Sequence, residues 1–263
     1  MRLFWFVIIF IIIINGICNS SKKIKLPKHV SNHLQLVYFD NGIGGFWYSS
    51  KEKNDHVIIC FRGLESFESQ EKNVIQLEKI FPNYDIIYIE TPGVGISSHV
   101  PVTPKSVMEE IYQVYTNIIR YQKWQKIGFV GIEYGAVIQS ELYAQCKRQK
   151  FILPHWIIQI NGFASMNTIV LHRVPFVFQM FIQSNKFESS ENYKNTNLPI
   201  LLFHSKNNRL APFVDSVQLY FKLRSNSKCK MIPLYGHEQM TLLSKENLKI
   251  IKSAISTLDS TCL

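Results

Sequence analysis

The residues best placed to do chemistry form a five-residue turn, Gly131-Ile132-Glu133-Tyr134-Gly135. Its glycines have the spacing of a Gly-x-Ser-x-Gly elbow, in which a sharp strand-to-helix turn exposes the side chain of a nucleophilic serine. A glutamate, Glu133, stands where that serine would be. The frame therefore predicts a hydrolase-type site, and the side chain predicts that serine chemistry has been lost from it.

Two further residues are needed for this chemistry, an acid after a late strand and a histidine near the end of the chain, in that order. The apolar run 200–203 predicts the late strand, and the acid is then expected at Asn208. The histidine is His237, within Gly236-His237-Glu238. Of the three positions, Glu133 and Asn208 are substituted and His237 is intact.

Longer stretches resemble the serine carboxypeptidase family. Tyr88-Ile89-Glu90-Thr91-Pro92-Gly93-Val94-Gly95-Ile96-Ser97 is similar to that family's Glu-Ser-Pro-x-Gly-Val-Gly-Phe-Ser, and the elbow is similar to its Gly-Glu-Ser-Tyr-x-Gly, with Tyr134 kept. Residues 46–66 resemble its run into the oxyanion loop, and Ile160-Asn161-Gly162 resembles a later strand end. The resemblance touches the chain from about residue 34 to 245 and implies an α/β-hydrolase fold.

The departures from that family concern its catalytic parts. Its serine falls on Glu133, its acid on Asn208, and its carboxylate-binding glutamate on Ile132. The asparagine that opens its oxyanion loop falls on Arg62, which is followed by Gly63. Losing the acid to asparagine alone lowers turnover about 10⁴-fold in serine proteases, and losing the nucleophile removes the covalent route. The chain is thus predicted to be an inactive binding protein, with Arg62, Gly63 and Tyr134 among its ligand-binding residues.

The alternative is an active carboxypeptidase or esterase that uses Glu133 and His237. Carboxylates at this elbow attack carbon in dehalogenases and epoxide hydrolases, which this fold resembles, but those enzymes use aspartate. Glutamate is one methylene longer, which moves the attacking oxygen away from the near-attack position. A structural hypothesis for Glu133 is an ion pair with Arg62, His237 or both, since a buried carboxylate needs a partner.

No metal or cofactor site is predicted. Glu133, His204 and His237 could in principle converge on zinc, but nothing in their spacing requires it. Asp215 could replace the missing acid, yet its place in the first turn of a predicted helix is explained more simply by the helix dipole.

Short apolar runs alternate with helical patterns along most of the chain. Residues 33–39 and 45–48 predict a hairpin around Asp40-Asn41-Gly42. Buried strands are predicted at 57–61, 86–89, 127–130, 156–160 and 200–203. Helices are predicted at 104–121, 133–147, 213–223 and 245–255. This order predicts an α/β fold, a mainly parallel sheet flanked by helices, with its site at the carboxyl ends of the strands.

The ends and an insertion complete the organisation. Residues 1–18 predict a signal peptide, because Leu3 to Ile14 is apolar but short for a membrane span; an uncleaved anchor is the alternative. Residues 19–263 are predicted to form a single domain in the secretory pathway. Residues 163–197 break the alternation, as either a lid over the site or a buried core helix. Secretion would permit disulfides, but a buried free thiol is expected at Cys60.

Charge and composition limit the kinds of partner that the chain is expected to bind. Lys and Arg outnumber Asp and Glu by 29 to 19, and the basic residues are scattered, so a solvated surface is the simplest reading. The ligand is expected to be a peptide, a small apolar molecule or an anion. Nucleic acid fits a secreted chain poorly, and a membrane is expected as partner only if the N-terminal segment is retained.

Overall fold

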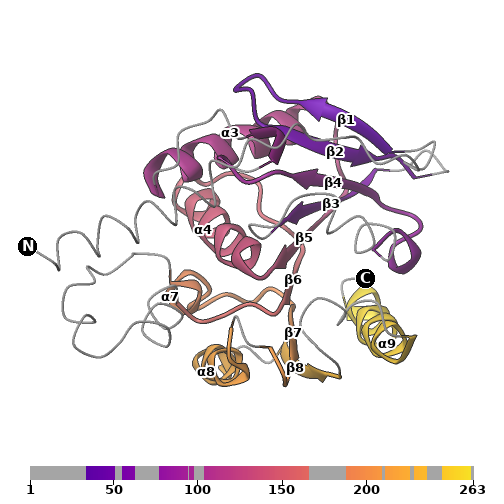
Figure 1. Ribbon diagram of the computed structural model, residues 1–263, viewed down its shortest axis with the longest axis vertical. Coiled ribbons are helices and arrows are strands. Elements are labelled where there is room, and N and C mark those ends of the chain that lie inside the picture. Colours follow the sequence, from indigo (N-terminus) through magenta and orange to yellow (C-terminus); the bar gives the residue numbers. More distant parts are fainter. Residues whose placement is uncertain are drawn as a thin grey trace, which may run out of the picture.

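One sheet organises the chain. The computed structural model describes residues 34–50, 55–62, 77–93, 95–97, 104–165, 188–208, 211–225, 228–235 and 245–261. Their strands form an eight-stranded sheet in the order β1-β2-β4-β3-β5-β6-β7-β8 (Figure 1). β2 is antiparallel to both of its neighbours, β1 and β4. All adjacent pairs from β4 to β8 are parallel. The predicted mainly parallel sheet is confirmed.

The strands follow the apolar runs of the sequence closely. They are β1 (Leu34–Tyr38), β2 (Gly44–Tyr48), β3 (His56–Phe61), β4 (Asp85–Ile89), β5 (Lys126–Ile132), β6 (Trp156–Ile160), β7 (Ile200–Ser205) and β8 (Cys229–Leu234). The hairpin prediction is confirmed, since β1 and β2 pair antiparallel. β8 was not predicted, because Lys230 and Pro233 interrupt its apolar pattern. An edge strand tolerates a proline because one of its sides needs no N–H donor.

The helices are α3 (Pro104–Tyr121), α4 (Tyr134–Arg148), α7 (Ser189–Asn192), α8 (Phe213–Leu223) and α9 (Lys245–Thr261), with a 3₁₀ turn, η1, at Gly95–Ser97. Two of the four predicted helices have their predicted bounds. The other two differ at one end or both: α4 begins after Glu133, whose backbone is not helical, and α9 continues beyond residue 255 to Thr261.

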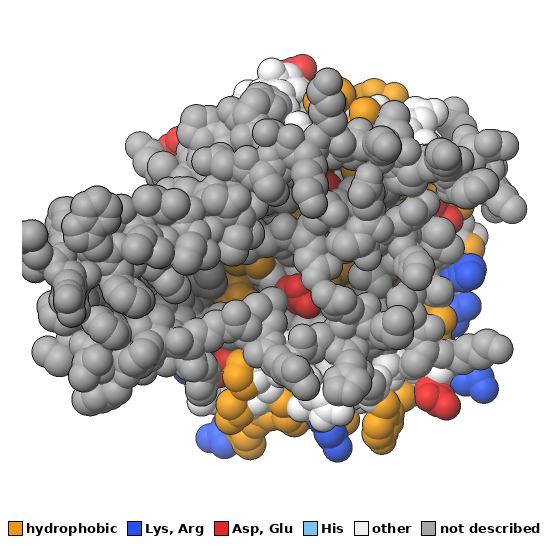
Figure 2. Space-filling view, viewed as in Figure 1, with side chains coloured by type: hydrophobic (Ala, Val, Ile, Leu, Met, Phe, Trp, Pro, Cys, Tyr) orange, Lys and Arg blue, Asp and Glu red, His pale blue; other side chains and the backbone are white. Residues whose placement is uncertain are grey.

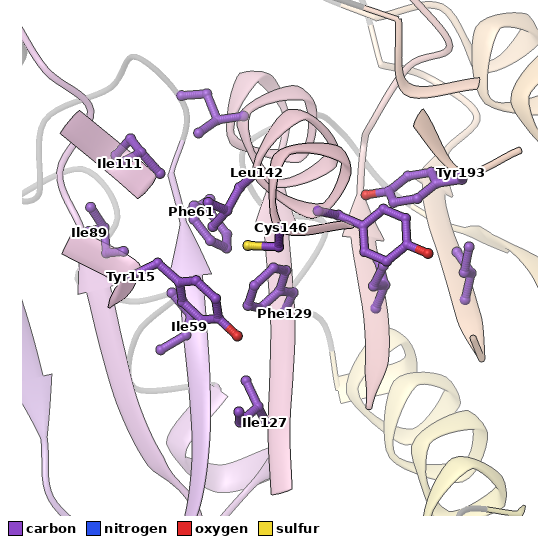
Figure 3. Packing of buried hydrophobic residues seen from close by; sticks show 14 of the residues in the cluster. Ile59, Phe61, Ile89, Ile111, Tyr115, Ile127, Phe129, Leu142, Cys146 and Tyr193 are labelled. Atoms are coloured by element: carbon purple, nitrogen blue, oxygen red, sulfur yellow. The ribbon is translucent and has the colours of Figure 1, made fainter. Parts of the chain in front are cut away.

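Helices cover both faces of the sheet, as Figure 1 shows. On one face, buried side chains of α3, α4 and α8 join a core with Ile59, Phe61 and Phe129, and Figure 3 shows Tyr115 of α3 and Leu142 of α4 directed toward these strands. Phe61 and Phe129 meet edge to face with ring centroids 5.2 Å apart. On the other face, α9 packs Ile251 and Ile255 into a second core. The sheet is thereby held rigid, and its strand ends are fixed in space.

Part of the predicted insertion lies in the described chain. Of that insertion, residues 163–165 and 188–197 are described, and they include α7, whose Ser189 and Ser190 are buried. The rest of the insertion, the predicted signal peptide and Cys262 lie outside the described residues. In the described segments, no helix has the length and apolar character that a membrane crossing requires.

Free thiols occupy three buried positions, Cys60, Cys146 and Cys229. Cys60 lies in β3 with no exposed surface, which confirms the free thiol expected there. Burial raises the pKa of the Cys60 and Cys146 thiols well above the usual range. Because the thiolate is the reactive form, these cysteines are inert packing residues.

Candidate active-site edge

Glu133 sits in a strained turn between β5 and α4. Its φ of 53° and ψ of −116° lie outside the helical and strand regions that side chains ordinarily adopt. Two backbone hydrogen bonds hold it there: its N–H donates to Ile160 O at 2.8 Å, and its carbonyl accepts from Ala136 N at 3.0 Å. This is the strand, strained turn and helix of a nucleophile elbow, with a half-buried glutamate at its apex.

The two glycines of the elbow are required by close packing. A Cβ on Gly135 would lie 2.1 Å from Phe61 O, at the end of β3. A Cβ on Gly131 would lie 2.5 Å from Ala136 Cα and 2.5 Å from Gln139 Oε1. Such distances exclude any side chain, so the glycine spacing in the sequence reflects how tightly α4 approaches β3 and β5.

Replacing Glu133 by glycine is expected to stabilise the fold relative to alanine. A non-glycine residue in a rare backbone conformation costs about 1–3 kcal/mol, and glycine removes that cost while losing about 0.5–1 kcal/mol of backbone entropy. We expect Glu133→Gly to unfold with a free energy about 1–2 kcal/mol higher than Glu133→Ala. Urea denaturation of the two variants measures the difference, and equal midpoints would show that the turn is unstrained.

Arg62 makes a buried ion pair that the sequence did not predict. Its Nη1 donates to Oε1 of Glu90 in a buried ion pair. The register explains the contact, because Phe61 and Ile89 are opposite each other in the parallel pair β3–β4 and the two charged residues follow them directly. Burial raises the pKa of the Glu90 carboxyl, and Arg62 opposes that shift. The expected pairing of Glu133 with Arg62 or His237 stays a prediction.

The stretch from 88 to 97 is held by its own polar residues. Gly93 takes a φ of 79°, and its N–H donates to Ser97 O at 2.9 Å. Ser97 Oγ, in η1, accepts from Gly44 N at 2.9 Å. Together with the Arg62 contact of Glu90, these bonds tie the turn after β4 to β2 and β3. The motif residues Glu90 and Ser97 are therefore structural.

The next strand ends carry asparagines. Asn161 follows β6 with a φ of 53°, and its Oδ1 accepts from Ser205 N, at the end of β7, at 2.9 Å. Asn208 lies in the turn after β7, buried, and its Oδ1 accepts from Ala211 N at 3.0 Å. Asn208 therefore occupies the strand-end position where an acid was expected, and its side chain shapes the turn into α8.

A buried histidine lies beside this turn. His204 Nε2 contacts Ala211 O at 2.8 Å, and Nδ1 contacts Ser216 Oγ at 2.5 Å. Ser216 Oγ also lies 2.5 Å from Gly162 O. Both ring nitrogens thus bond to protein groups that join β7, β6 and α8. Burial lowers the pKa of the His204 imidazole, and carbonyl contacts with Ala211 and Gly162 oppose the shift.

This histidine is expected to make the fold sensitive to acid. Because the folded-state pKa of His204 lies below its ordinary value of 6.5, the unfolded chain binds the proton first as the pH falls. The stability that neutral His204 contributes is complete above pH 6.5 and is lost as the pH falls toward the folded-state pKa. Over that range the free energy of unfolding falls by at most about 1.4 kcal/mol per pH unit. Urea denaturation of the parent and of His204→Asn between pH 7.5 and 5 tests this: the free energy of unfolding should fall less steeply with falling pH in the variant. An equal fall in both proteins would contradict the prediction.

Buried amides lie directly behind the elbow. Gln159 Nε2 donates to Ala136 O at 3.1 Å and to Tyr193 Oη at 3.1 Å. Ser140, on α4, bonds through Oγ to Val137 O and to Ser189 Oγ of α7. These contacts anchor α7 to the helix that carries the elbow. Ser140 is a poor nucleophile candidate, since its hydroxyl is buried and hydrogen-bonded.

Four of the predicted site residues lie at the carboxyl edge of the sheet: Arg62, Glu133, Tyr134 and Asn208. The other two, Gly63 and His237, lie outside the described residues. Tyr235, at the end of the described segment before His237, exchanges two backbone hydrogen bonds with the side chain of Asn247 of α9. Neither the Arg62–Glu90 ion pair nor the His204–Ser216 contact was predicted from the sequence. The only sequence signal for the ion pair is the opposite charge of two residues that each follow an apolar run.

Asp215, considered as a replacement acid, is buried in the first turn of α8. Among the described residues, no group of three or more His, Cys, Asp or Glu side chains is arranged to hold a metal ion.

Comparison with known proteins defines the fold. No family model matches the chain, and neither does any curated protein sequence. Among solved structures, an esterase/lipase from an uncultured bacterium superposes with a TM-score of 0.64 and 12% identity, covering 96% of this chain and 98% of that one. An esterase from Pyrococcus furiosus gives a TM-score of 0.65 and 11% identity, with 92% and 98% covered. An acylaminoacyl peptidase from Pyrococcus horikoshii gives 0.64 and 17%, covering 93% of this chain and 43% of the peptidase. At these identities the likeness establishes the α/β-hydrolase fold.

Proposed function

We propose that this protein is a non-catalytic binding protein built on an α/β-hydrolase frame. The observation that carries the proposal is Glu133, which occupies the apex of an intact elbow where the nucleophile of such a frame stands. Without a serine or cysteine there, the ester or thioester intermediate of a serine or cysteine hydrolase cannot form. Asn208 at the acid position cannot support a histidine cation.

One residue of the proposed ancestral site now stabilises the fold. The Arg62 guanidinium, at the position that opens the oxyanion loop in serine carboxypeptidases, is buried against Glu90. The resemblance to that family suggests a peptide as ligand, and the basic balance of the chain leaves a small anion or an apolar molecule as alternatives. Glu133 and Tyr134, both half-buried at the edge of the sheet, are the side chains from which a ligand would be bound.

The proposal includes secretion, on the strength of the apolar segment Leu3 to Ile14 and the small residues that follow it. Sequencing the amino terminus of the mature protein tests this part. A start at or near Asn19 is expected, and retention of Met1 would point to a membrane anchor.

The second candidate is a hydrolase that uses the Glu133 carboxylate as nucleophile. It is favoured by one observation, the strained elbow backbone that is kept at residue 133. In that mechanism the carboxylate would attack an acyl or ester carbon, the alcohol or amine would leave, and water would cleave the resulting adduct on residue 133. An adduct on that side chain is therefore its signature.

The experiment that separates the two is incubation of the purified protein with a fluorophosphonate probe and with peptide and ester substrates. We expect no labelled serine, no released product and no adduct on Glu133 by mass spectrometry. Product release that disappears in Glu133→Gln but persists in Glu246→Gln, a matched change on the surface of α9, would establish the hydrolase instead.

A further inference from the structure

The outward side of α8 carries an apolar stripe next to the exposed Gln218. Asp215, Ser216, Leu219 and Leu223 turn inward and are buried. One turn of helix takes 3.6 residues, so Val214, Val217 and Phe221 share the opposite face. Val214 is 48% exposed and Phe221 is 58% exposed. A helix packed on one side of a sheet is ordinarily polar on the side that faces water, and α8 departs from that rule.

Another helix of the same sheet obeys the rule. On α9, Ile251 and Ile255 face the core, and the exposed positions include Glu246, Lys249 and Lys252. The apolar outer face of α8 is therefore a local feature and does not reflect the general composition of the chain.

Positive charge gathers around this face. Residues 206–230 contain six basic residues (Lys206, Arg209, Lys222, Arg224, Lys228 and Lys230) and one acidic residue (Asp215). That acid is buried, whereas Lys206, Lys222, Arg224, Lys228 and Lys230 are exposed. Figure 2 shows hydrophobic and basic side chains side by side along the lower rim, where Figure 1 places α8 and β8.

We propose that the outer face of α8, with the basic residues at its ends, docks on a lipid surface that carries anionic headgroups. The helix lies parallel to the surface, Val214 and Phe221 enter the boundary of the acyl chains, and Lys222 and Arg224 reach headgroup phosphates with their long stems. A narrow apolar stripe fits this partner better than a protein, because a stable protein interface buries about 800 Å² on each side. The proposal is independent of the function proposed for the elbow.

Vesicle flotation with the full-length chain tests it. With vesicles of 30% phosphatidylserine and 70% phosphatidylcholine we expect binding that is at least about tenfold stronger than with phosphatidylcholine alone and that weakens in 0.5 M salt. Lys222→Glu/Arg224→Glu should lower the affinity for the anionic vesicles at least about tenfold. Val214→Ser/Phe221→Ser should lower it at both salt concentrations, since it removes the apolar contribution.

Matched variants exclude other causes. Lys249→Glu/Lys252→Glu makes the same change of charge on α9, and Ile152→Ser removes another exposed apolar side chain, 50% exposed; both should bind like the parent. The N-terminal apolar segment is common to all variants, so it cannot produce a difference between them. Because Lys222 Nζ donates to Ser190 Oγ at 3.1 Å, thermal unfolding verifies that each variant is folded. Equal affinities of the α8 and α9 variants, or binding to polyglutamate without binding to vesicles, would overturn the proposal.

Discussion

A chain that carries both Glu133→Ser and Asn208→Asp is expected to react with a fluorophosphonate probe about 10⁴-fold faster than a chain that carries Glu133→Ser alone. The elbow that would present the serine is already in place, because two backbone hydrogen bonds fix residue 133 in its strained conformation. An aspartate at 208 can accept the bond that Asn208 Oδ1 accepts from Ala211 N, and it would also orient His237 and stabilise its cation. The rate of label incorporation at residue 133, followed by mass spectrometry, measures the gain.

Two control chains define this result. Asn208→Asp alone leaves Glu133 in place and should stay unlabelled, and adding His237→Ala to the double variant should abolish the gained reactivity. If the double variant labels no faster than Glu133→Ser, residue 208 is not the acid position, and the descent of this site from a serine hydrolase loses its main support.

Elements with strong periodic patterns were predictable from the sequence. The bounds of α3, α8 and β6 follow from apolar spacing and the prolines and turns beside them. The predicted helix 133–147 includes Glu133, yet the elbow holds the backbone of that residue at a positive φ. Tertiary packing overrode local propensity at that residue.

Contacts across the sheet were harder to predict. Arg62 and Glu90 each follow an apolar run, but which strands are neighbours depends on the order β2-β4-β3-β5, and periodicity within a strand carries no information about that order. His204 and Ser216 are likewise joined only because the turn at Asn208 returns the chain against β7. The sequence therefore predicted that Arg62, Glu133 and Asn208 lie at one edge of the sheet, but it did not predict the partners of the side chains there.

The best-matching stretch is explained by the same geometry. Glu90 and Ser97 hold the turn after β4 against β2 and β3, so their resemblance to serine carboxypeptidases concerns the frame of the site. Under the function proposed above, positions 133 and 208 would concern its chemistry, while Glu90 and Ser97 would keep the strand ends ordered for binding.

Gly135→Ala is expected to destabilise the domain by about 3 kcal/mol or more, the upper range for inserting a methyl group into a packed interior. The added Cβ would lie 2.1 Å from Phe61 O, 2.4 Å from Phe61 C and 2.6 Å from Arg62 O. All three are backbone atoms at the end of β3, which cannot rotate away as a side chain could. Either α4 must retreat from the sheet or β3 must shift within it, and both movements break the core around Phe61 and Phe129.

Thermal unfolding measures the effect, because for a domain of this size 3 kcal/mol corresponds to a fall in Tm of about 6–12 °C. Lys147→Ala, an exposed change near the other end of α4, should leave Tm within about 2 °C of the parent, since surface substitutions change stability by about 0.5 kcal/mol or less. A Gly135→Ala chain that unfolds together with the Lys147→Ala control would mean that α4 does not press against the end of β3. The elbow geometry, and with it the placement of Glu133 at a nucleophile position, would then be wrong.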